Sequence, residues 1–369
     1  MLKVRLVAYI ALTTFFIILI EVTSYLMLNI AQSNYVNLIF QKDTITKVFV
    51  ENTPGFHPVL GWVPFKEVDG FEARIDSSKY NATEPCMEMY GDSFTWGDQV
   101  NKEYAWPTKV GELIKCRVLN FGVSGYGSDQ ALMRYQGNTI YSEMVILNHL
   151  SENIIRNVNQ FRNLIFPSKA ITLKPRFVIE NGSLSYLKAP KFQGQELGNI
   201  KHELTADYFV PDGKSGIKSD FTFPYSLSLV KYMINHFHVS SKIKGKPRYM
   251  QFYDSLHPSR ALDVTVKIIE TFLKEAKSRN QIPLITIIPT CRDFEYFTLH
   301  GVLTYQPLLD QLKEKKINIF DFMLPIASRK SNFYKLFKNN ECKNHYNEEG
   351  NKLMAEIFVE HLRALGLQK

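Results

Sequence analysis

Two residues of this 369-residue chain have the chemistry of a nucleophile and its base. Ser93 stands in Gly91-Asp92-Ser93, directly after a short apolar run. A serine at the end of a buried strand can present its hydroxyl and attack a carbonyl carbon. His345 lies near the C-terminus, and histidine is the usual general base for a serine nucleophile. We therefore expect acyl-transfer chemistry if the fold brings Ser93 and His345 together.

Two intervening segments offer hydrogen-bond donors for the negative charge that develops on the carbonyl oxygen. The segment from Asn120 to Gly125 contains glycines, which let backbone N–H groups approach a substrate closely. Asn153 follows another apolar run and has a side-chain amide that can donate a second hydrogen bond. Each segment alone is also typical of an ordinary turn. Their order, each after an apolar run, makes the pattern specific.

The elements that must position these residues can be predicted from hydrophobic patterns. Short runs rich in Val, Ile and Leu predict strands at 87–90, 117–120, 144–147, 284–288 and 317–320. Helical patterns predict helices at 106–114, 129–135, 262–279, 305–315 and 347–365. Alternation of strands and helices favours an α/β fold with a parallel sheet covered on both faces. Ligands bind such sheets beyond the carboxyl ends of the strands, where the candidate residues are expected.

Together the four segments resemble the SGNH, or GDSL-like, hydrolase superfamily over about residues 85–160 and 280–365. The resemblance implies a flavodoxin-like three-layer α/β/α sandwich. It implies Ser93 as nucleophile and His345 as base, with Gly125 and Asn153 in the oxyanion hole. Of the family's third segment, usually Gly-x-Asn-Asp, only Asn153 is retained. The implied activity is ester hydrolysis or O-acyl transfer. We expect neither a cofactor nor a metal, since no cysteine pair has the Cys-x-x-Cys spacing of a zinc site.

The family's acidic residue three positions before the histidine is replaced by Cys342. A main-chain carbonyl, Glu341, or Asp293 in the loop after the strand at 284–288 could orient His345 instead. An Asp-x-x-His sequence does occur elsewhere in the chain, from Asp254 to His257. We interpret His257 as the start of a helix, because no glycine-containing helix start follows it and predicted strands lie downstream.

The resemblance also predicts how the four cysteines pair. In the flavodoxin-like order the strands opened by Cys86 and Cys116 are neighbours, about 5 Å apart, which suits the roughly 4.4–6.8 Å Cα spacing of a disulfide. Cys291 and Cys342 are expected in loops at the carboxyl edge of the sheet. A bridge there would hold the loop that carries His345 and give a physical reason for losing the acidic residue. Free thiols or the crossed pairing are the alternatives.

The N-terminal segment is long and apolar enough to cross a membrane. Residues 6–30 are mostly apolar, and a bilayer core needs about 20 such residues in a helix. Lys3 and Arg5 precede the run, so the positive-inside rule leaves the N-terminus in the cytoplasm and places the rest in the periplasm or outside the cell. A cleaved signal peptide is the alternative, but no Ala-x-Ala site follows. Disulfides fit the same oxidising side.

The predicted organisation has three parts: a membrane anchor over 1–31, a juxtamembrane stalk and lead-in segment over 32–80, and a hydrolase domain over 81–369. The domain carries an insertion at about 158–255, with a hairpin predicted around Asn181-Gly182. The fractions of hydrophobic (45%) and charged (22%) residues are ordinary for a globular protein. The net charge of +8 is dispersed and no nucleic-acid-binding module is visible, so no nucleic-acid partner is expected.

The expected partners are the membrane and an acylated carbohydrate or lipid of the cell envelope. The expected activity is deacylation or O-acyl transfer through a Ser-His acyl-enzyme mechanism. The alternative is a non-catalytic protein on the same fold that binds a polysaccharide or another partner, because the residue that would orient His345 is missing from its usual place.

Overall fold

The structure is a computed structural model that describes residues 2–40, 47–48, 55–64, 66, 68, 73–74, 80, 83–166, 170–189, 207–209, 221–235 and 241–367. Parts of the stalk predicted at 32–80 and of the insertion predicted at about 158–255 lie outside these residues. The chain divides into two compact units. The smaller unit comprises 1–48, 161–172 and 191–248, and the larger unit comprises 49–160, 173–190 and 249–369. Every candidate site residue lies in the larger unit.

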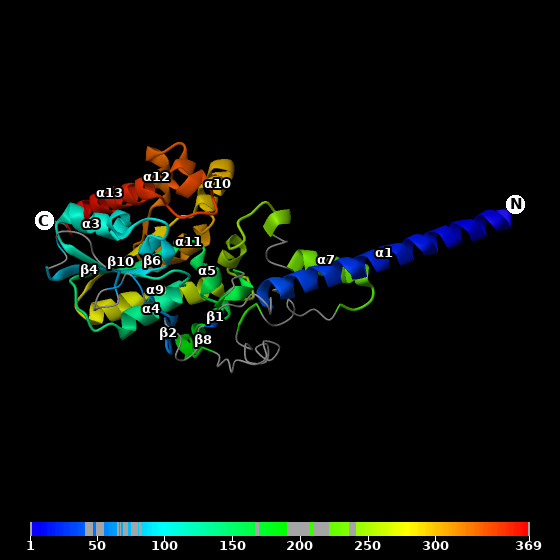
Figure 1. Cartoon of the computed structure of the whole chain (residues 1–369), viewed down its shortest axis with the longest axis horizontal. Coiled ribbons are helices and arrows are strands. Elements are labelled where there is room, and N and C mark those ends of the chain that lie inside the picture. The colour runs from blue at the N-terminus through cyan, green and yellow to red at the C-terminus, as the bar shows by residue number, and fades with distance from the viewer. Residues whose placement is uncertain are drawn as a thin grey trace. The chain divides into compact units, whose positions relative to one another are not determined.

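A five-stranded parallel sheet forms the centre of the larger unit (Figure 1). Its strands are β4 (Pro85–Gly91), β5 (Arg117–Gly122), β6 (Met144–Leu150), β10 (Ile282–Ile288) and β11 (Phe320–Asp321). Their order across the sheet is β11-β10-β6-β4-β5, which is the flavodoxin-like order. The predicted fold is therefore confirmed, and β11 is shorter than the predicted strand at 317–320. Every residue of the central strand β6 is buried, as expected for a sheet covered on both faces.

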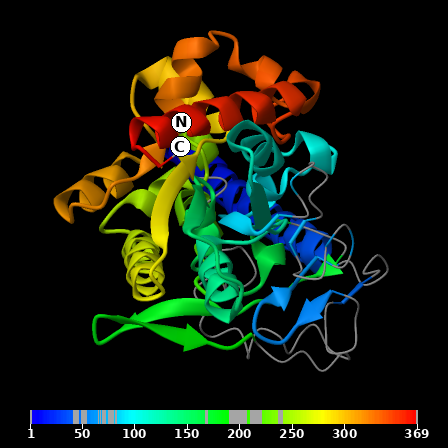
Figure 2. The same cartoon turned by 90° about the vertical axis from the view of Figure 1, so that its left-hand side faces the viewer.

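Helices cover both faces of this sheet (Figures 1 and 2). The helices of the larger unit are α2 (Ser93–Trp96), α3 (Trp106–Ile114), α4 (Ser128–Gly137), α5 (Asn153–Arg156), α9 (Ala261–Ser278), α10 (Cys291–His300), α11 (Gln306–Glu314), α12 (Met323–Arg329) and α13 (Glu348–Ala364). Helices α3 and α13 pack together on one face, while α4 and α9 pack together on the other. All five helices predicted from the sequence are present. The three-layer arrangement leaves the carboxyl edge of the sheet to the loops that carry the candidate residues.

Short elements complete the described part of the larger unit. They are the hairpin of β2 (Phe56–His57) and β3 (Gly61–Trp62), the hairpin of β8 (Arg176–Glu180) and β9 (Ser183–Leu187), and the 3-10 turns η1 (Lys102–Tyr104), η4 (Met250–Tyr253), η5 (Phe333–Leu336) and η6 (Lys338–Asn340). The turn between β8 and β9 is the predicted Asn181-Gly182. Both residues have positive φ, as the tight turn of a two-residue hairpin requires.

The start of α13 fixes the chain just after His345. Asn347 caps this helix, because its Oδ1 accepts a hydrogen bond from the Gly350 N–H at 3.0 Å. Glu348 and Glu349 occupy the first turn, where negative charge interacts favourably with the helix dipole. The cap that the sequence predicts therefore places His345 two residues before the cap of α13.

Helix α10 corrects one expectation. Cys291 and Asp293 were expected in a loop after the strand at 284–288, but both belong to the first turn of α10. The reason is a capping box: Asp293 accepts hydrogen bonds from the backbone N–H of Thr290 at 2.6 Å and from its hydroxyl at 2.8 Å. The Thr-x-x-Asp spacing was visible in the sequence and was not recognised as a helix start.

The smaller unit contains the helix α1 (Leu2–Phe40), which is 39 residues long. Its segment Val4–Ile30 is long and apolar enough to cross a membrane, and its side chains are almost all exposed to the surroundings. Helix α7 (Tyr225–Asn235) packs against α1 (Figure 1). The strands β1 (Lys47–Val48) and β7 (Ala170–Ile171) pair in parallel, and η2 (Arg162–Leu164) is a 3-10 turn.

Candidate active site

Ser93 is the first residue of α2, directly beyond the carboxyl end of β4. Asp92 caps this short helix, since its Oδ1 accepts a hydrogen bond from the Phe94 N–H at 2.9 Å. Gly122, at the end of the neighbouring strand β5, lets α2 lie close: a Cβ at this position would stand 2.3 Å from the Trp96 backbone nitrogen. The sheet edge thus holds the Ser93 hydroxyl in a defined place.

His345 lies against Ser93, although 252 residues separate them in the sequence. The distance from His345 Nε2 to Ser93 Oγ is 2.8 Å, which is within hydrogen-bond reach for proton transfer. The backbone N–H of His345 donates to Gln99 Oε1 at 3.1 Å, and its carbonyl accepts from the Lys338 N–H at 2.9 Å. The imidazole packs on the Phe94 ring, with 4.6 Å between ring centroids.

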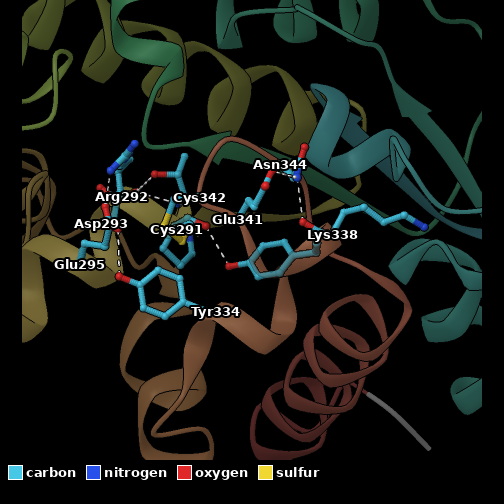
Figure 3. Close-up of a disulfide and its surroundings, with 12 residues drawn as sticks. Cys291, Arg292, Asp293, Glu295, Tyr334, Lys338, Glu341, Cys342 and Asn344 are labelled. Atoms are coloured by element: carbon cyan, nitrogen blue, oxygen red, sulfur yellow. Dashed lines mark hydrogen bonds and ion pairs between the residues drawn. A yellow bond between two sulfur atoms is a disulfide. The ribbon is translucent and has the colours of Figure 1, made fainter.

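The other ring nitrogen of His345, Nδ1, is buried and has no hydrogen-bond partner in the described part of the chain. Asp293 is turned elsewhere, since its carboxylate accepts hydrogen bonds from the hydroxyls of Ser151, Thr290, Thr304 and Tyr249. Glu341 accepts a hydrogen bond from Asn344 Nδ2 (Figure 3). It also forms an ion pair with Lys343. The structure therefore places neither carboxylate on Nδ1 and corrects the expectation that Asp293 or Glu341 orients the ring. The carboxylate of Asp293 is already used in the capping box of α10, and the side chain of Glu341 is exposed to solvent.

The charge state of His345 follows from its surroundings. Burial lowers the pKa of its imidazole, because the charged form loses hydration. The carboxylates of Asp98 and Glu152 act against burial and raise this pKa, whereas Arg156 lowers it further. The pKa stays below its usual value, so His345 is neutral at neutral pH and can accept a proton. Asp98 is the carboxylate that acts most strongly on an imidazolium at this position, and sequence reasoning missed it.

Asn153 and Gly125 lie just beyond the carboxyl ends of β6 and β5. Asn153 is the first residue of α5, and its Oδ1 accepts from Arg156 Nη1 at 3.1 Å. Its Nδ2 is buried and has no hydrogen-bond partner among the described residues. Gly125 has φ +83°, a left-handed conformation in which any other L-residue would be strained.

Arg156 joins these strand-end segments to each other. Its Nη1 lies 3.0 Å from Asp92 Oδ2, 2.9 Å from the Tyr126 carbonyl oxygen and 3.1 Å from Asn153 Oδ1. Only 5% of the arginine is exposed. Burial raises the pKa of Asp92 to about 6, and Arg156 acts in the opposite direction. Sequence reasoning did not single out Arg156; its position one helical turn after Asn153 was the available signal.

Both predicted disulfides are formed. Cys86 and Cys116 join the amino ends of β4 and β5, with 6.1 Å between their Cα atoms. Cys291 and Cys342 join the first turn of α10 to the loop that carries His345, with 4.9 Å between Cα atoms (Figure 3). His257 takes no part in this site: its Nδ1 lies 2.7 Å from Ser259 Oγ, and its ring packs on Phe252.

No known family model matches this chain, and no curated protein matches it. Solved structures do match. A protein assigned to the lipolytic G-D-S-L family from Desulfitobacterium hafniense DCB-2 is 16% identical, covering 73% of this chain and 95% of its own, with a TM-score of 0.36. A member of that family from Veillonella parvula DSM 2008 is 14% identical, covering 74% and 96%, with a TM-score of 0.36. A carbohydrate esterase is 12% identical, covering 76% and 65%, with a TM-score of 0.33. At these values the function rests on the geometry of the site.

Proposed function

We propose that this chain is a serine esterase or O-acyltransferase in which Ser93 is the nucleophile and His345 the general base. The observation that carries the proposal is the 2.8 Å distance between Ser93 Oγ and His345 Nε2 at the carboxyl edge of the sheet. It is supported by Asn153 Nδ2, which has no partner in the part of the chain that the structure describes and offers a donor beyond another strand end. A nucleophile, a base and an oxyanion donor are the three parts that acyl transfer requires.

In the proposed reaction, His345 Nε2 takes the proton from Ser93 Oγ as the oxygen attacks the acyl carbonyl carbon. The amides of Ser93 and Gly125 and the side chain of Asn153 donate hydrogen bonds to the oxyanion. When the tetrahedral intermediate collapses, the imidazolium returns the proton to the leaving alcohol and an acyl-serine remains. Water, or a sugar hydroxyl, then attacks the acyl-serine by the reverse sequence.

The proposed substrate is an acylated carbohydrate or lipid of the cell envelope. The apolar helix supports membrane anchoring, and the two disulfides support an oxidising compartment. Lys3 and Arg5 before the apolar segment favour a cytoplasmic N-terminus, with the hydrolase unit in the periplasm or outside the cell. A C-terminal reporter that is active only outside the cytoplasm tests this orientation, and we expect it to be active. Activity of a reporter that works only in the cytoplasm would instead place the C-terminus in the cytoplasm.

Hydrolysis of an activated acetyl ester by the full-length chain in detergent tests the chemistry. Ser93→Ala and His345→Ala should each lose roughly three orders of magnitude in kcat, as triad members do in serine hydrolases. His257→Ala is the matched control and should keep wild-type turnover, because His257 contacts Ser259 rather than Ser93. Full activity of Ser93→Ala, or loss confined to His257→Ala, would refute the assignment.

A second candidate function is non-catalytic binding of a polysaccharide or another partner at the same edge of the sheet. The observation that favours it is His345 Nδ1, which has no acceptor in the described residues to orient the ring. The ester assay separates the two functions. The binding function would be established if the wild-type chain binds acylated polysaccharide but hydrolyses no ester. The Ser93→Ala variant should then bind the polysaccharide as tightly as the wild type does.

A further inference from the structure

Helix α7 is attached to the apolar helix α1 by a carboxylate within the apolar segment. Glu21 of α1 accepts hydrogen bonds from the backbone N–H groups of Tyr225, at 2.5 Å, and of Ser226, at 3.3 Å, and from the Ser226 hydroxyl. The rings of Tyr25 and Tyr225 lie 4.9 Å apart. Glu21 therefore caps the N-terminus of α7, where a negative charge interacts favourably with the helix dipole.

The contact runs along one face of α1. Between residues 4 and 30, Ser24 and Leu28 are the buried side chains. They lie three and seven residues after Glu21, which places all three on the same side of the helix. On α7 the half-buried residues Tyr225, Leu229 and Tyr232 have the equivalent spacing.

The remaining surface of α7 is exposed and mostly apolar. Leu227, Val230 and Ile234 are 50%, 51% and 61% exposed, and their spacing places them on one stripe. Lys231 is also exposed beside this stripe. Exposure of such a stripe to water is unfavourable, because removing apolar surface from water stabilises a protein by roughly 25 cal/mol per Å². We therefore expect an apolar partner to cover this stripe.

The position of Glu21 along α1 identifies that partner. Glu21 lies 17 residues after Val4, where the apolar segment begins. At about 1.5 Å per residue this is roughly 26 Å along the helix axis, close to the roughly 30 Å thickness of a bilayer core. The N-terminus of α7 thus lies at the depth of the outer interface. There the Lys231 ammonium can reach the headgroups while its carbon chain stays among lipid.

We propose that α7 is a second membrane-binding element, an interfacial helix that packs beside α1 at the outer interface and places Leu227, Val230 and Ile234 against the lipid of the outer leaflet. The partner is bilayer lipid. In this arrangement Glu21 and the N–H groups of α7 satisfy each other where neither would meet bulk water. The inference rests on the proposed membrane anchoring by α1.

Spin-label accessibility on the full-length chain in phosphatidylcholine vesicles tests this proposal. Nitroxides are attached to Leu227→Cys and Ile234→Cys, with Ile17→Cys reporting the middle of α1. Leu299→Cys, an exposed leucine of the larger unit, is the reference for a label outside α1 and α7. The four native cysteines are paired and do not compete for label. Labels at 227 and 234 should show several-fold lower access to a water-soluble nickel complex than the label at 299, together with high access to oxygen.

Two outcomes distinguish the failures. If the labels on α7 are fully accessible to the nickel complex while the label at Ile17 is protected, α1 spans the bilayer but α7 does not bind the membrane. If the label at Ile17 is also accessible, the anchoring itself fails. Glu21→Ala gives a further check: loss of the cap should raise nickel access at 227 and leave it unchanged at 17. Unchanged protection at 227 would show that Glu21 does not hold α7 in place.

Discussion

Removing the bridge between Cys291 and Cys342 should lower the kcat of the proposed enzyme by more than the accompanying loss of stability can explain. The perturbation is the double variant Cys291→Ala/Cys342→Ala, which releases the His345 loop from α10. The chain offers a matched control in Cys86→Ala/Cys116→Ala, because that bridge joins the amino ends of β4 and β5, away from Ser93.

The two bridges should stabilise the fold by similar amounts. They close loops with sequence separations of 51 and 30 residues. The chain-entropy relation then gives about 4.1 kcal/mol for Cys291–Cys342 and about 3.6 kcal/mol for Cys86–Cys116. A difference of about 0.5 kcal/mol cannot produce a large difference in the folded fraction.

The effects on catalysis should differ, because only one bridge fixes the base. Without the Cys291–Cys342 bridge, His345 keeps its hydrogen bonds to Gln99 and Lys338, so the loop should shift rather than unfold. A displacement of about 1 Å can cost about 10²-fold. We therefore expect kcat to fall by roughly tenfold to a hundredfold in Cys291→Ala/Cys342→Ala and to change little in the control.

The assay compares ester hydrolysis and denaturant unfolding of the two double variants and the wild type. Activity is measured well below the unfolding midpoint of each variant, so that the folded fraction does not differ. Equal kcat for both double variants, with equal losses of stability, would refute the reasoning that the second bridge positions His345.

Three further predictions concern the site itself. Asn153→Ala should lower kcat by about 10²–10³-fold, as loss of one oxyanion donor does, and kcat within a few-fold of wild type would exclude this role. Arg156→Ala should lower kcat, and added guanidinium should restore part of it, because Arg156 positions Asn153 and Asp92; failure of guanidinium to rescue a folded variant would argue against positioning. Since burial lowers the pKa of His345 in the free chain and only the neutral imidazole accepts a proton, kcat/KM should rise with pH through a midpoint below the usual value of about 6.5 and then level off; a midpoint above that value would contradict the inferred charge state of His345.

Local patterns were sufficient for most elements of the larger unit. Strands β6 and β10 are recognisable from their apolar stretches, Met144–Leu147 and Leu284–Ile288, the second interrupted only by Thr286, and the start of α13 is encoded in the Asn347 cap. Such signals act over a few residues, so a sequence reports them directly. The missed start of α10 was of the same kind, since Thr290 and Asp293 stand three residues apart.

The pairing of the cysteines needed more than local pattern. It followed from the strand order that the resemblance implies, which makes β4 and β5 neighbours and brings the ends of β10 and the His345 loop to one edge. Because strand order restricts which ends can meet, the two pairings could be predicted before any side chain was placed. Cys291 lies in a helix rather than in the expected loop, but this difference does not change its pairing with Cys342.

The sequence by itself determined the residue types at the strand ends: Ser93 after β4, Gly125 after β5, Asn153 after β6 and His345 before α13. Only the tertiary structure decided which of their polar atoms are satisfied. Asp293 bonds to four hydroxyls instead of His345, and Arg156 meets Asp92, which is 64 residues away. Glu21 likewise meets Ser226 across 205 residues. Hydrogen bonds between distant residues depend on how whole elements pack, and no short stretch of sequence contains that information.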